Sequence, residues 1–401
     1  MSEKGEVALL TAKLNSGETI TLAEKYSRNQ LEAIRKKEEF YCRSCSEKLI
    51  LKIGTQRIPH FAHEKGSECT EYDRESEYHM SGKIKLFEWL ETQGLSPEME
   101  CYYPVIKQRA DIAFTYEEKT FCIEFQCSTI SAEVFRKRTE GYRKLSLHPI
   151  WILGGKNINR KQTHKLSLTS FHYLFLKETA NREVYLPAYC PQTNQFIRLE
   201  NLISLTTRTA YASIFCKPLE KWTVQDLIEP KITFSPSLKY WSSDLLLYKN
   251  TLITNGQALQ DLFLFELYSH TLHPYTLPSY VGLPLKQNYA IETAPFIWQT
   301  YLFLEHLFGR EPGTIVRFQD AYKTILKRLK EKQLVVRDLP CMHRNPLPFV
   351  IQDYLVALTQ IGVLKKKENN IYLIDKEIKI ANNMEERLKE EVKFYQEYYE
   401  N

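Results

Sequence analysis

Three polar side chains that could bind a catalytic metal ion lie close together in the first half of the chain. Asp111 falls in a segment, residues 108–114, whose apolar residues alternate as in a β-strand. Glu124 and Gln126 share the polar face of a second such segment, residues 121–126. Side by side, the two strands would bring all three onto one surface. Their oxygens suit Mg²⁺ or Mn²⁺, which would bind a scissile phosphate and lower the pKa of an attacking water.

A helix expected over residues 73–92 supplies further polar groups. His79 and Lys83 project within its broad apolar face, and Glu75 lies at the edge of that face. Charged groups on an inward face need partners, so we expect all three to point toward the strands and to take part in catalysis. The alternative is that Lys83 snorkels outward from the edge of the face.

A second helix, from a cap at Ser128 or Ser131 to about residue 147, is strongly basic. Taken alone it would be read as a solvated face, but beside a carboxylate cluster it fits binding of the DNA backbone. A buried strand follows at residues 148–153, so residues 73–155 give the pattern helix, strand, strand, helix, strand. We assign DNA binding to five residues of this helix: Arg136, Lys137, Arg138, Tyr142 and Arg143.

Soft metal ligands are concentrated before this region. Cys42 and Cys45 are separated by two residues, and a hairpin would return the chain through His63 to Cys69. This spacing resembles a zinc ribbon, and four protein ligands would make the site structural. His60 is the alternative nitrogen donor. The competing interpretation is that the cysteines are buried thiols and that the histidines lie on a strand face.

The amino-acid composition is that of a folded protein. The 401 residues are 43% hydrophobic and 26% charged, which excludes wholesale disorder, while a net charge of +5 decides nothing about partners. The chain begins without the pattern of a secretory signal and has no uncharged apolar stretch of about 18 residues. We therefore expect a cytoplasmic protein, in which nine cysteines favour metal binding over disulfides.

The chain should contain several domains. We expect an N-terminal hairpin, helix and zinc-finger-like module over residues 1–72, a nuclease-like core over 73–155, and a mixed, then helical region over 156–314. Strands are expected near residues 183–186 and 196–199, with Leu262, Phe265 and Leu302 among the core residues of the helical part. Residues 315–401 should be helical and winged-helix-like, because a helix precedes a lysine-bearing hairpin.

The order of these motifs resembles a known family. Asp111, Glu124-x-Gln126, a helix with Arg138-x-x-x-Tyr142 and a strand containing Trp151 are similar to the PD-(D/E)xK nuclease core. Three further motifs make the whole resemble the competence protein CoiA family: Tyr41-Cys-x-x-Cys45, His60-Phe-Ala-His63 and Glu75-Ser-x-x-His79-x-x-x-Lys83. The resemblance is dense over residues 40–155.

The resemblance implies a mixed α/β fold. A restriction-endonuclease-like PD-(D/E)xK core would lie between the zinc-ribbon-like module and a mainly helical C-terminal region. It also implies a role in natural transformation, where incoming single-stranded DNA is recombined with RecA. Gln126 departs from the usual lysine and supplies no positive charge, so Lys83 or Arg138 would have to provide it. The chain is thus expected to be a Mg²⁺-dependent deoxyribonuclease, or else an inactive scaffold that binds single-stranded DNA and the recombinase.

Overall fold

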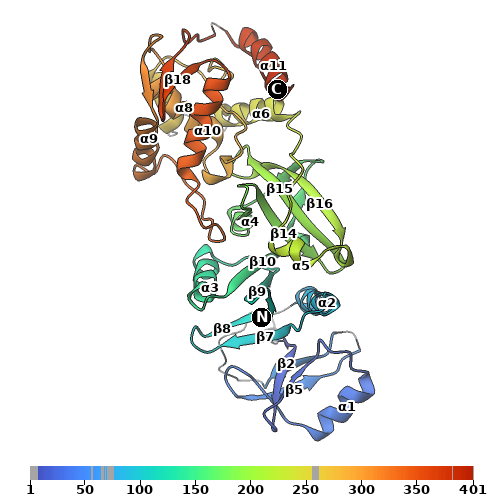
Figure 1. Cartoon of the computed structure of the whole chain (residues 1–401). Helices are drawn as coiled ribbons and strands as arrows, with labels where there is room; N and C mark the ends of the chain where they lie inside the picture. Colours follow the sequence, from blue (N-terminus) through green and yellow to red (C-terminus); the bar gives the residue numbers. More distant parts are fainter. Residues whose placement is uncertain are drawn as a thin grey trace. The chain divides into compact units, whose positions relative to one another are not determined.

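The chain is described by a computed structural model that covers residues 8–55, 57–64, 67, 69, 76–254, 262–381 and 383–400, without the side chains of residues 396 and 398–400. It divides into two compact units (Figure 1). Unit 1 comprises Met1–Ile158, Leu186–Arg198 and Phe215–Lys231, and unit 2 comprises Asn159–Tyr185, Leu199–Ile214 and Ile232–Asn401. None of the helices in the described ranges is both long enough and apolar enough to cross a bilayer.

Unit 1 begins with a small antiparallel sheet and one helix. The strand order is β1-β6-β5-β4-β2-β3. A capping box at Ser27 begins the helix, whose apolar side buries Leu31. The elements are β1 (Ala8–Leu9), β2 (Thr11–Leu14), β3 (Thr19–Thr21), α1 (Arg28–Lys37), β4 (Phe40–Tyr41), β5 (Lys48–Lys52) and β6 (His60–His63).

The second part of unit 1 is a sheet with a helix on each face (Figure 1). Its strands run in the order β14-β10-β9-β8-β7, with β10 parallel to β9 and to β14 and the remaining pairs antiparallel. The strand β7 is an addition to the pattern predicted from the sequence. The elements are α2 (Glu77–Thr92), β7 (Glu98–Tyr103), β8 (Gln108–Tyr116), β9 (Lys119–Gln126), α3 (Ala132–Lys144), β10 (His148–Gly154) and β14 (Val184–Cys190).

Strand alternation decides which helix covers which face. Ile112, Ile123 and Phe125 pack in one apolar cluster with residues of α2 such as Leu86. On the other face, small residues of β8 and β9 pack in a separate cluster with Tyr142 of α3. Gly82 lets α2 approach closely, since a Cβ at this position would lie 1.9 Å from the ring of Phe125.

The residues that follow β10 belong alternately to unit 2 and unit 1. Strands β14, β15 (Gln195–Ser204) and β16 (Thr209–Pro218) each contribute residues to both. The sequence predicted only the starts of β14 and β15, and it did not predict β16. The shorter elements are η1 (Gly155–Asn157), β11 (Asn159–Arg160), β12 (Lys165–Ser167), α4 (Ser170–Tyr173), β13 (Lys177–Glu178), η2 (Leu219–Lys221) and α5 (Val224–Ile228).

The rest of unit 2 is mainly helical around an aromatic core that includes Trp241, Trp298 and Tyr354. Leu302 is buried as expected, but Leu262 and Phe265 are 63% and 65% exposed, so their prediction as core residues was wrong. They lie on a face of α7 that does not pack inward. The helices are α6 (Trp241–Thr254), α7 (Leu262–Ser269), η3 (Asn288–Ala290), α8 (Pro295–His306), α9 (Phe318–Lys330), α10 (Leu347–Gln360) and α11 (Met384–Glu400).

A three-stranded antiparallel sheet accompanies these helices. Its order is β17-β19-β18, where β17 spans Ile315–Arg317, β18 spans Leu364–Glu368 and β19 spans Ile371–Ile374. Asn370, at a φ of +60°, makes the tight turn between β18 and β19. In chain order the elements are α8, β17, α9, α10, β18 and β19.

Candidate functional site

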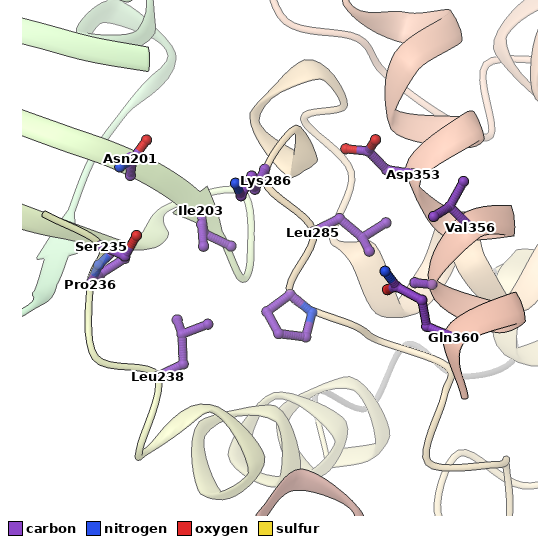
Figure 2. Close-up of a pocket in the computed structure, with 12 residues that line it drawn as sticks. Asn201, Ile203, Ser235, Pro236, Leu238, Leu285, Lys286, Asp353, Val356 and Gln360 are labelled. Atoms are coloured by element: carbon purple, nitrogen blue, oxygen red, sulfur yellow. The ribbon is translucent and has the colours of Figure 1, made fainter. Parts of the chain in front are cut away.

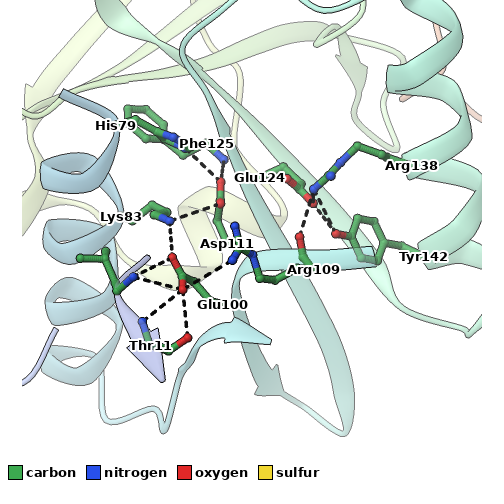
Figure 3. Close-up of polar contacts among 11 residues, drawn as sticks. Thr11, His79, Lys83, Glu100, Arg109, Asp111, Glu124, Phe125, Arg138 and Tyr142 are labelled. Carbon is green, nitrogen blue, oxygen red and sulfur yellow. Dashed lines mark hydrogen bonds and ion pairs between the residues drawn. The ribbon is translucent and has the colours of Figure 1, made fainter. Parts of the chain in front are cut away.

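Three carboxylates lie on neighbouring strands of the unit 1 sheet (Figure 3). The pairing of the flanking residues sets Glu100 of β7 beside Asp111 of β8, and Asp111 beside Glu124 of β9. The ladder between β8 and β9 begins one residue beyond Asp111, because Asp111 Oδ2 accepts a 2.8 Å hydrogen bond from the backbone N–H of Phe125. The strands therefore part where the carboxylates lie.

Helix α2 supplies the partners of Asp111. His79 Nε2 lies 3.3 Å from Asp111 Oδ2, and Lys83 Nζ lies 3.9 Å from Asp111 Oδ1. Burial by itself would raise the pKa of Asp111, but His79, Lys83 and the Phe125 N–H hold that pKa well below its ordinary value. Asp111 is therefore a carboxylate that stays ionised although it is nearly buried.

Helix α3 supplies the partners of Glu124, which is 3% exposed. Arg138 Nη2 donates to Glu124 Oε1 at 2.5 Å and to the Arg109 carbonyl at 3.0 Å, and the Tyr142 hydroxyl also donates to Glu124. Burial raises the pKa of Glu124 above its ordinary value and nearby Asp111 adds to the effect, although Arg138 opposes it. Adjacent carboxylates thus have pKa values displaced in opposite directions, as in many acid–base sites.

Lys83 does not snorkel outward. Its side chain is completely buried, and its ammonium donates a 2.7 Å hydrogen bond to Glu100, a shorter contact than the one to Asp111. Glu100 was not predicted from the sequence as a site residue. It is also fully buried and lies at a φ of +52°. Burial would raise the pKa of Glu100, but Lys83, Arg109 and the Leu10 N–H hold it below its ordinary value.

The other residues predicted for this site are Gln126, Glu75 and three basic residues of α3. The Gln126 amide donates to the carbonyl and hydroxyl of Ser128, at 2.9 and 3.1 Å. Glu75 lies outside the described residues. Arg136 and Lys137 are exposed on α3 and Arg143 is half-buried, so these three remain accessible.

Two of the predicted DNA-binding residues point inward instead. Tyr142 is fully buried, so its prediction as a DNA contact was wrong. Its ring packs between α3 and the sheet, and its hydroxyl donates a hydrogen bond to Glu124. Arg138 also reaches inward and pairs with Glu124. This position fits the other role predicted for Arg138, that of the cation missing at Gln126.

The N-terminal sheet carries a cluster of four metal-binding side chains. One ligand atom each of Cys42, Cys45, His63 and Cys69 lies within 4.8 Å of the other three. Cys42 follows β4, the backbone N–H of Ser44 points to the Cys42 sulfur at 3.4 Å, and His63 ends β6. Three sulfurs and one nitrogen are the donor set of a structural metal ion.

His60 lies outside this cluster. It is buried, and its Nδ1 is 2.9 Å from the Ile58 carbonyl, whereas His63 Nε2 is 3.3 Å from the Cys45 sulfur. Burial raises the pKa of the Cys45 thiol to about 12, with hydrogen bonds to Cys69 and Cys42 adding to the rise. Burial also lowers the pKa of His63, which favours the neutral imidazole that binds metals.

Unit 2 has a pocket of about 410 Å³ alongside α10 (Figure 2). Burial raises the pKa of Asp353, on α10 at this pocket, to about 6, although Lys286 and Arg182 oppose the rise. No sequence motif predicted a site here. Its lining combines apolar side chains with a few polar ones: Asn201, Ile203, Ser235, Pro236, Leu238, Pro284, Leu285, Lys286, Asp353, Val356, Ala357 and Gln360.

The carboxylate-bearing sheet belongs to a nuclease-like domain. Residues 75–232 match the family model of the competence protein CoiA nuclease-like domain, and residues 23–72 and 241–388 match those of the CoiA N-terminal and C-terminal domains. The chain is also 30% identical over 348 residues to the competence protein CoiA of Bacillus subtilis (strain 168), across 85% of this chain and 91% of that relative. The chain belongs to the CoiA family, which confirms the resemblance seen in the sequence. No solved structure gives a significant match.

Proposed function

We propose that this chain is a metal-dependent nuclease that acts on incoming DNA during natural transformation. The observation that carries the proposal is the pair of neighbouring carboxylates, Asp111 and Glu124, at the point where β8 and β9 part. A helix on either face of the sheet supplies cations to this point. This arrangement supports the proposal of a PD-(D/E)xK core.

Asp111 and Glu124 fit a divalent cation because both offer hard oxygen ligands from rigid strands. Held there, Mg²⁺ or Mn²⁺ would bind the scissile phosphate and lower the pKa of the attacking water. The Phe125 N–H fixes the Asp111 carboxylate in one orientation. His79 and Lys83 favour the ionised form of Asp111. Burial raises the pKa of Glu124, and Arg138 opposes that rise.

The chain's other residues have distinct roles in this proposal. Lys83 and Arg138 stabilise negative charge that develops on the phosphate and so replace the lysine that is absent at Gln126. His79, beside Asp111, holds or moves a proton at its Nε2 atom. Gln126 orients the attacking water when its amide turns from Ser128, and Glu75 remains a further candidate.

The accessible basic residues of α3 would hold the substrate. Arg136, Lys137 and Arg143 would contact phosphates without reading base sequence. The CoiA family resemblance favours single-stranded DNA and the recombinase RecA as partners, in the cytoplasm. Cleavage would then occur on DNA that has already entered the cell.

A second function has one observation in its favour. The ion pairs around Asp111 and Glu124 occupy the carboxylates, and the Gln126 amide is turned toward Ser128. A nuclease fold in which those ion pairs persist would bind DNA without cutting it. The chain would then act as a scaffold between single-stranded DNA and the recombinase.

Cleavage and binding measured together distinguish the two functions. The assay uses labelled single-stranded DNA with Mg²⁺ or Mn²⁺ and compares the wild type with Asp111→Asn. If the chain is a nuclease, only the wild type should cleave the DNA. The variant should bind DNA as tightly as the wild type or more tightly, because a negative charge is removed near the phosphates. Binding without cleavage by either protein would favour the scaffold.

We also propose that the cluster of Cys42, Cys45, His63 and Cys69 binds a structural zinc ion. Four protein ligands leave no position for a reactive water, so the ion would stabilise the fold. The small N-terminal sheet has a limited apolar core, and metal binding would supply part of its folding free energy.

For unit 2 we infer a winged helix over residues 295–374. The chain order α8, β17, α9, α10, β18, β19 and the sheet order β17-β19-β18 support it. Helix α10 would be the recognition helix, but its one charged residue is Asp353, so it is poorly suited to DNA phosphates. DNA contact, if made by this element, would come from Lys365, Lys366 and Lys367 of the wing.

A further inference from the structure

Glu100 is a buried carboxylate to which the proposed reaction gives no role. It is fully buried on β7 beside Asp111, and it has a positive φ. A buried charge is strongly destabilising unless hydrogen bonds and opposite charges compensate it. The partners of Glu100 therefore indicate what it does.

One group of partners comes from the N-terminal sheet (Figure 3). The backbone N–H groups of Leu10 and Thr11 donate to the Glu100 carboxylate at 3.1 to 3.2 Å, and the Thr11 hydroxyl donates at 2.9 Å. These residues lie at the junction of β1 and β2, where the strand ladder is interrupted. Glu100 thus satisfies backbone donors that the sheet leaves unpaired.

The N-terminal sheet also fixes the backbone around Glu100. Arg43, between the cluster residues Cys42 and Cys45, donates to the carbonyls of Met99 and Glu100 at 3.4 Å. It also pairs with Glu98 at 2.6 Å. The turn that carries two metal-binding cysteines therefore holds the strand that carries Glu100.

The other partners of Glu100 are cations of the proposed catalytic site. Lys83 Nζ is 2.7 Å from Glu100 Oε1 but 3.9 Å from Asp111 Oδ1. Arg109 Nη1 is 3.8 Å from Glu100 Oε2. Among the described side chains, the ion pairs of this cluster join three carboxylates to three permanent cations: Glu100, Asp111 and Glu124 to Lys83, Arg109 and Arg138.

We propose that Glu100 is a positioning residue, which holds the Lys83 ammonium away from Asp111 so that Asp111 can bind a divalent cation. The N-terminal sheet takes part through Leu10, Thr11 and Arg43. Without the Glu100 charge, Asp111 and Glu124 face three cations, and Lys83 pairs with Asp111. This inference rests on the proposed function, because it assigns Glu100 to the same metal site.

Mn²⁺ affinity tests the inference without depending on turnover. The free Mn²⁺ signal in electron paramagnetic resonance is titrated with the purified full chain, and Glu124→Gln defines the binding that belongs to this site. Glu100→Gln keeps one acceptor oxygen for the Leu10 and Thr11 donors but removes the charge. Because a net positive charge is added near the metal, the dissociation constant for Mn²⁺ should rise about tenfold.

The chain offers a matched control. Glu391 of α11 is 2% exposed and pairs with buried Lys249 at 3.0 Å, so Glu391→Gln removes the same charge from the same kind of pair in unit 2. It should lower stability to a similar degree while leaving Mn²⁺ affinity within about twofold of the wild type. An equal loss of affinity in both variants would overturn the inference, because general destabilisation would then explain it.

Thr11→Val keeps the inference testable if Glu100→Gln does not fold. It removes only the hydroxyl that donates to Glu100, and it should weaken Mn²⁺ binding about two- to threefold. Unchanged Mn²⁺ affinity in folded Glu100→Gln, or in Thr11→Val when that is the measurable variant, would overturn the inference but not the proposed function. A wild type that binds no Mn²⁺ at this site would overturn both.

Discussion

The Asp111 carboxylate accepts a 2.8 Å hydrogen bond from the backbone N–H of Phe125, the residue after Glu124. A side chain thus takes the place of a backbone carbonyl in the ladder between β8 and β9. The bond links the position of Asp111 to the strand that carries Glu124. The two carboxylates are therefore held by backbone structure before any metal binds, which is what a preorganised metal site requires.

Zinc content should follow His63 and not His60. We expect about one zinc per chain in the wild type and in His60→Asn, and a large loss in His63→Ala, because His63 alone lies in the cysteine cluster. Elemental analysis by mass spectrometry checks this. Cys216→Ser, which alters an exposed thiol outside the cluster, is the control for handling. Equal zinc in the two histidine variants would contradict the assignment of His63.

Gly82→Ala should destabilise the chain although alanine favours helices. A Cβ at Gly82 would lie 1.9 Å from the Phe125 ring, so α2 would have to move away from β9. Overpacking that costs about 3 kcal/mol, less a gain of about 1 kcal/mol in helix propensity, gives a net loss of about 2 kcal/mol. Urea unfolding measures it.

Gly54→Ala is the matched control for this prediction. The nearest atom to a Cβ at Gly54 is 3.8 Å away, so its stability should change by less than about 0.5 kcal/mol. If Gly82→Ala were as stable as Gly54→Ala, the result would contradict the close packing of α2 on β9.

Asp353 should make unit 2 less stable as the pH rises. Burial raises the pKa of Asp353 to about 6 in the folded chain, so its contribution is fully present below the ordinary aspartate pKa and is lost as the pH rises through about 6. Asp353→Asn resembles the protonated form. The variant should therefore match the wild type in melting temperature at pH 4 and exceed it at pH 7.5.

Thermal unfolding at the two pH values checks this prediction. The control is Asp375→Asn, which changes an exposed aspartate in the same unit. A difference between wild type and Asp353→Asn that is the same at both pH values would mean that Asp353 does not titrate differently on folding.

The sequence predicted the elements that have a clear period. Alternation over residues 108–114 and 121–126 corresponds to β8 and β9, and the 3.6-residue period over 73–92 corresponds to α2. The same reasoning placed His79 and Lys83 on the face that meets the sheet. It did not place Tyr142, because the buried ring and its hydroxyl bond to Glu124 depend on how α3 packs.

Glu100 could not be predicted from local pattern. Its neighbours Met99 and Cys101 are apolar, but a positive φ at a glutamate leaves no signature in a single sequence. Its partners Leu10 and Thr11 lie about 90 residues earlier in the chain, and the break between β1 and β2 that frees their N–H groups is visible only in the folded sheet. Glu98 and Glu100 alternate with apolar residues, a pattern that by itself indicates an exposed strand face and gives no local signal for the burial of Glu100.

The most direct test of the central claim is metal-dependent cleavage by Glu124→Gln. Cleavage of single-stranded DNA under single-turnover conditions is compared for the wild type, Glu124→Gln and Glu91→Gln, a matched change at an exposed glutamate of α2. The wild type and Glu91→Gln should cut at similar rates with Mg²⁺ or Mn²⁺. Glu124→Gln should be at least about 100-fold slower, because a metal ligand is lost. Equal cleavage by all three proteins would contradict a catalytic site at Asp111 and Glu124, and so would the absence of cleavage in the wild type.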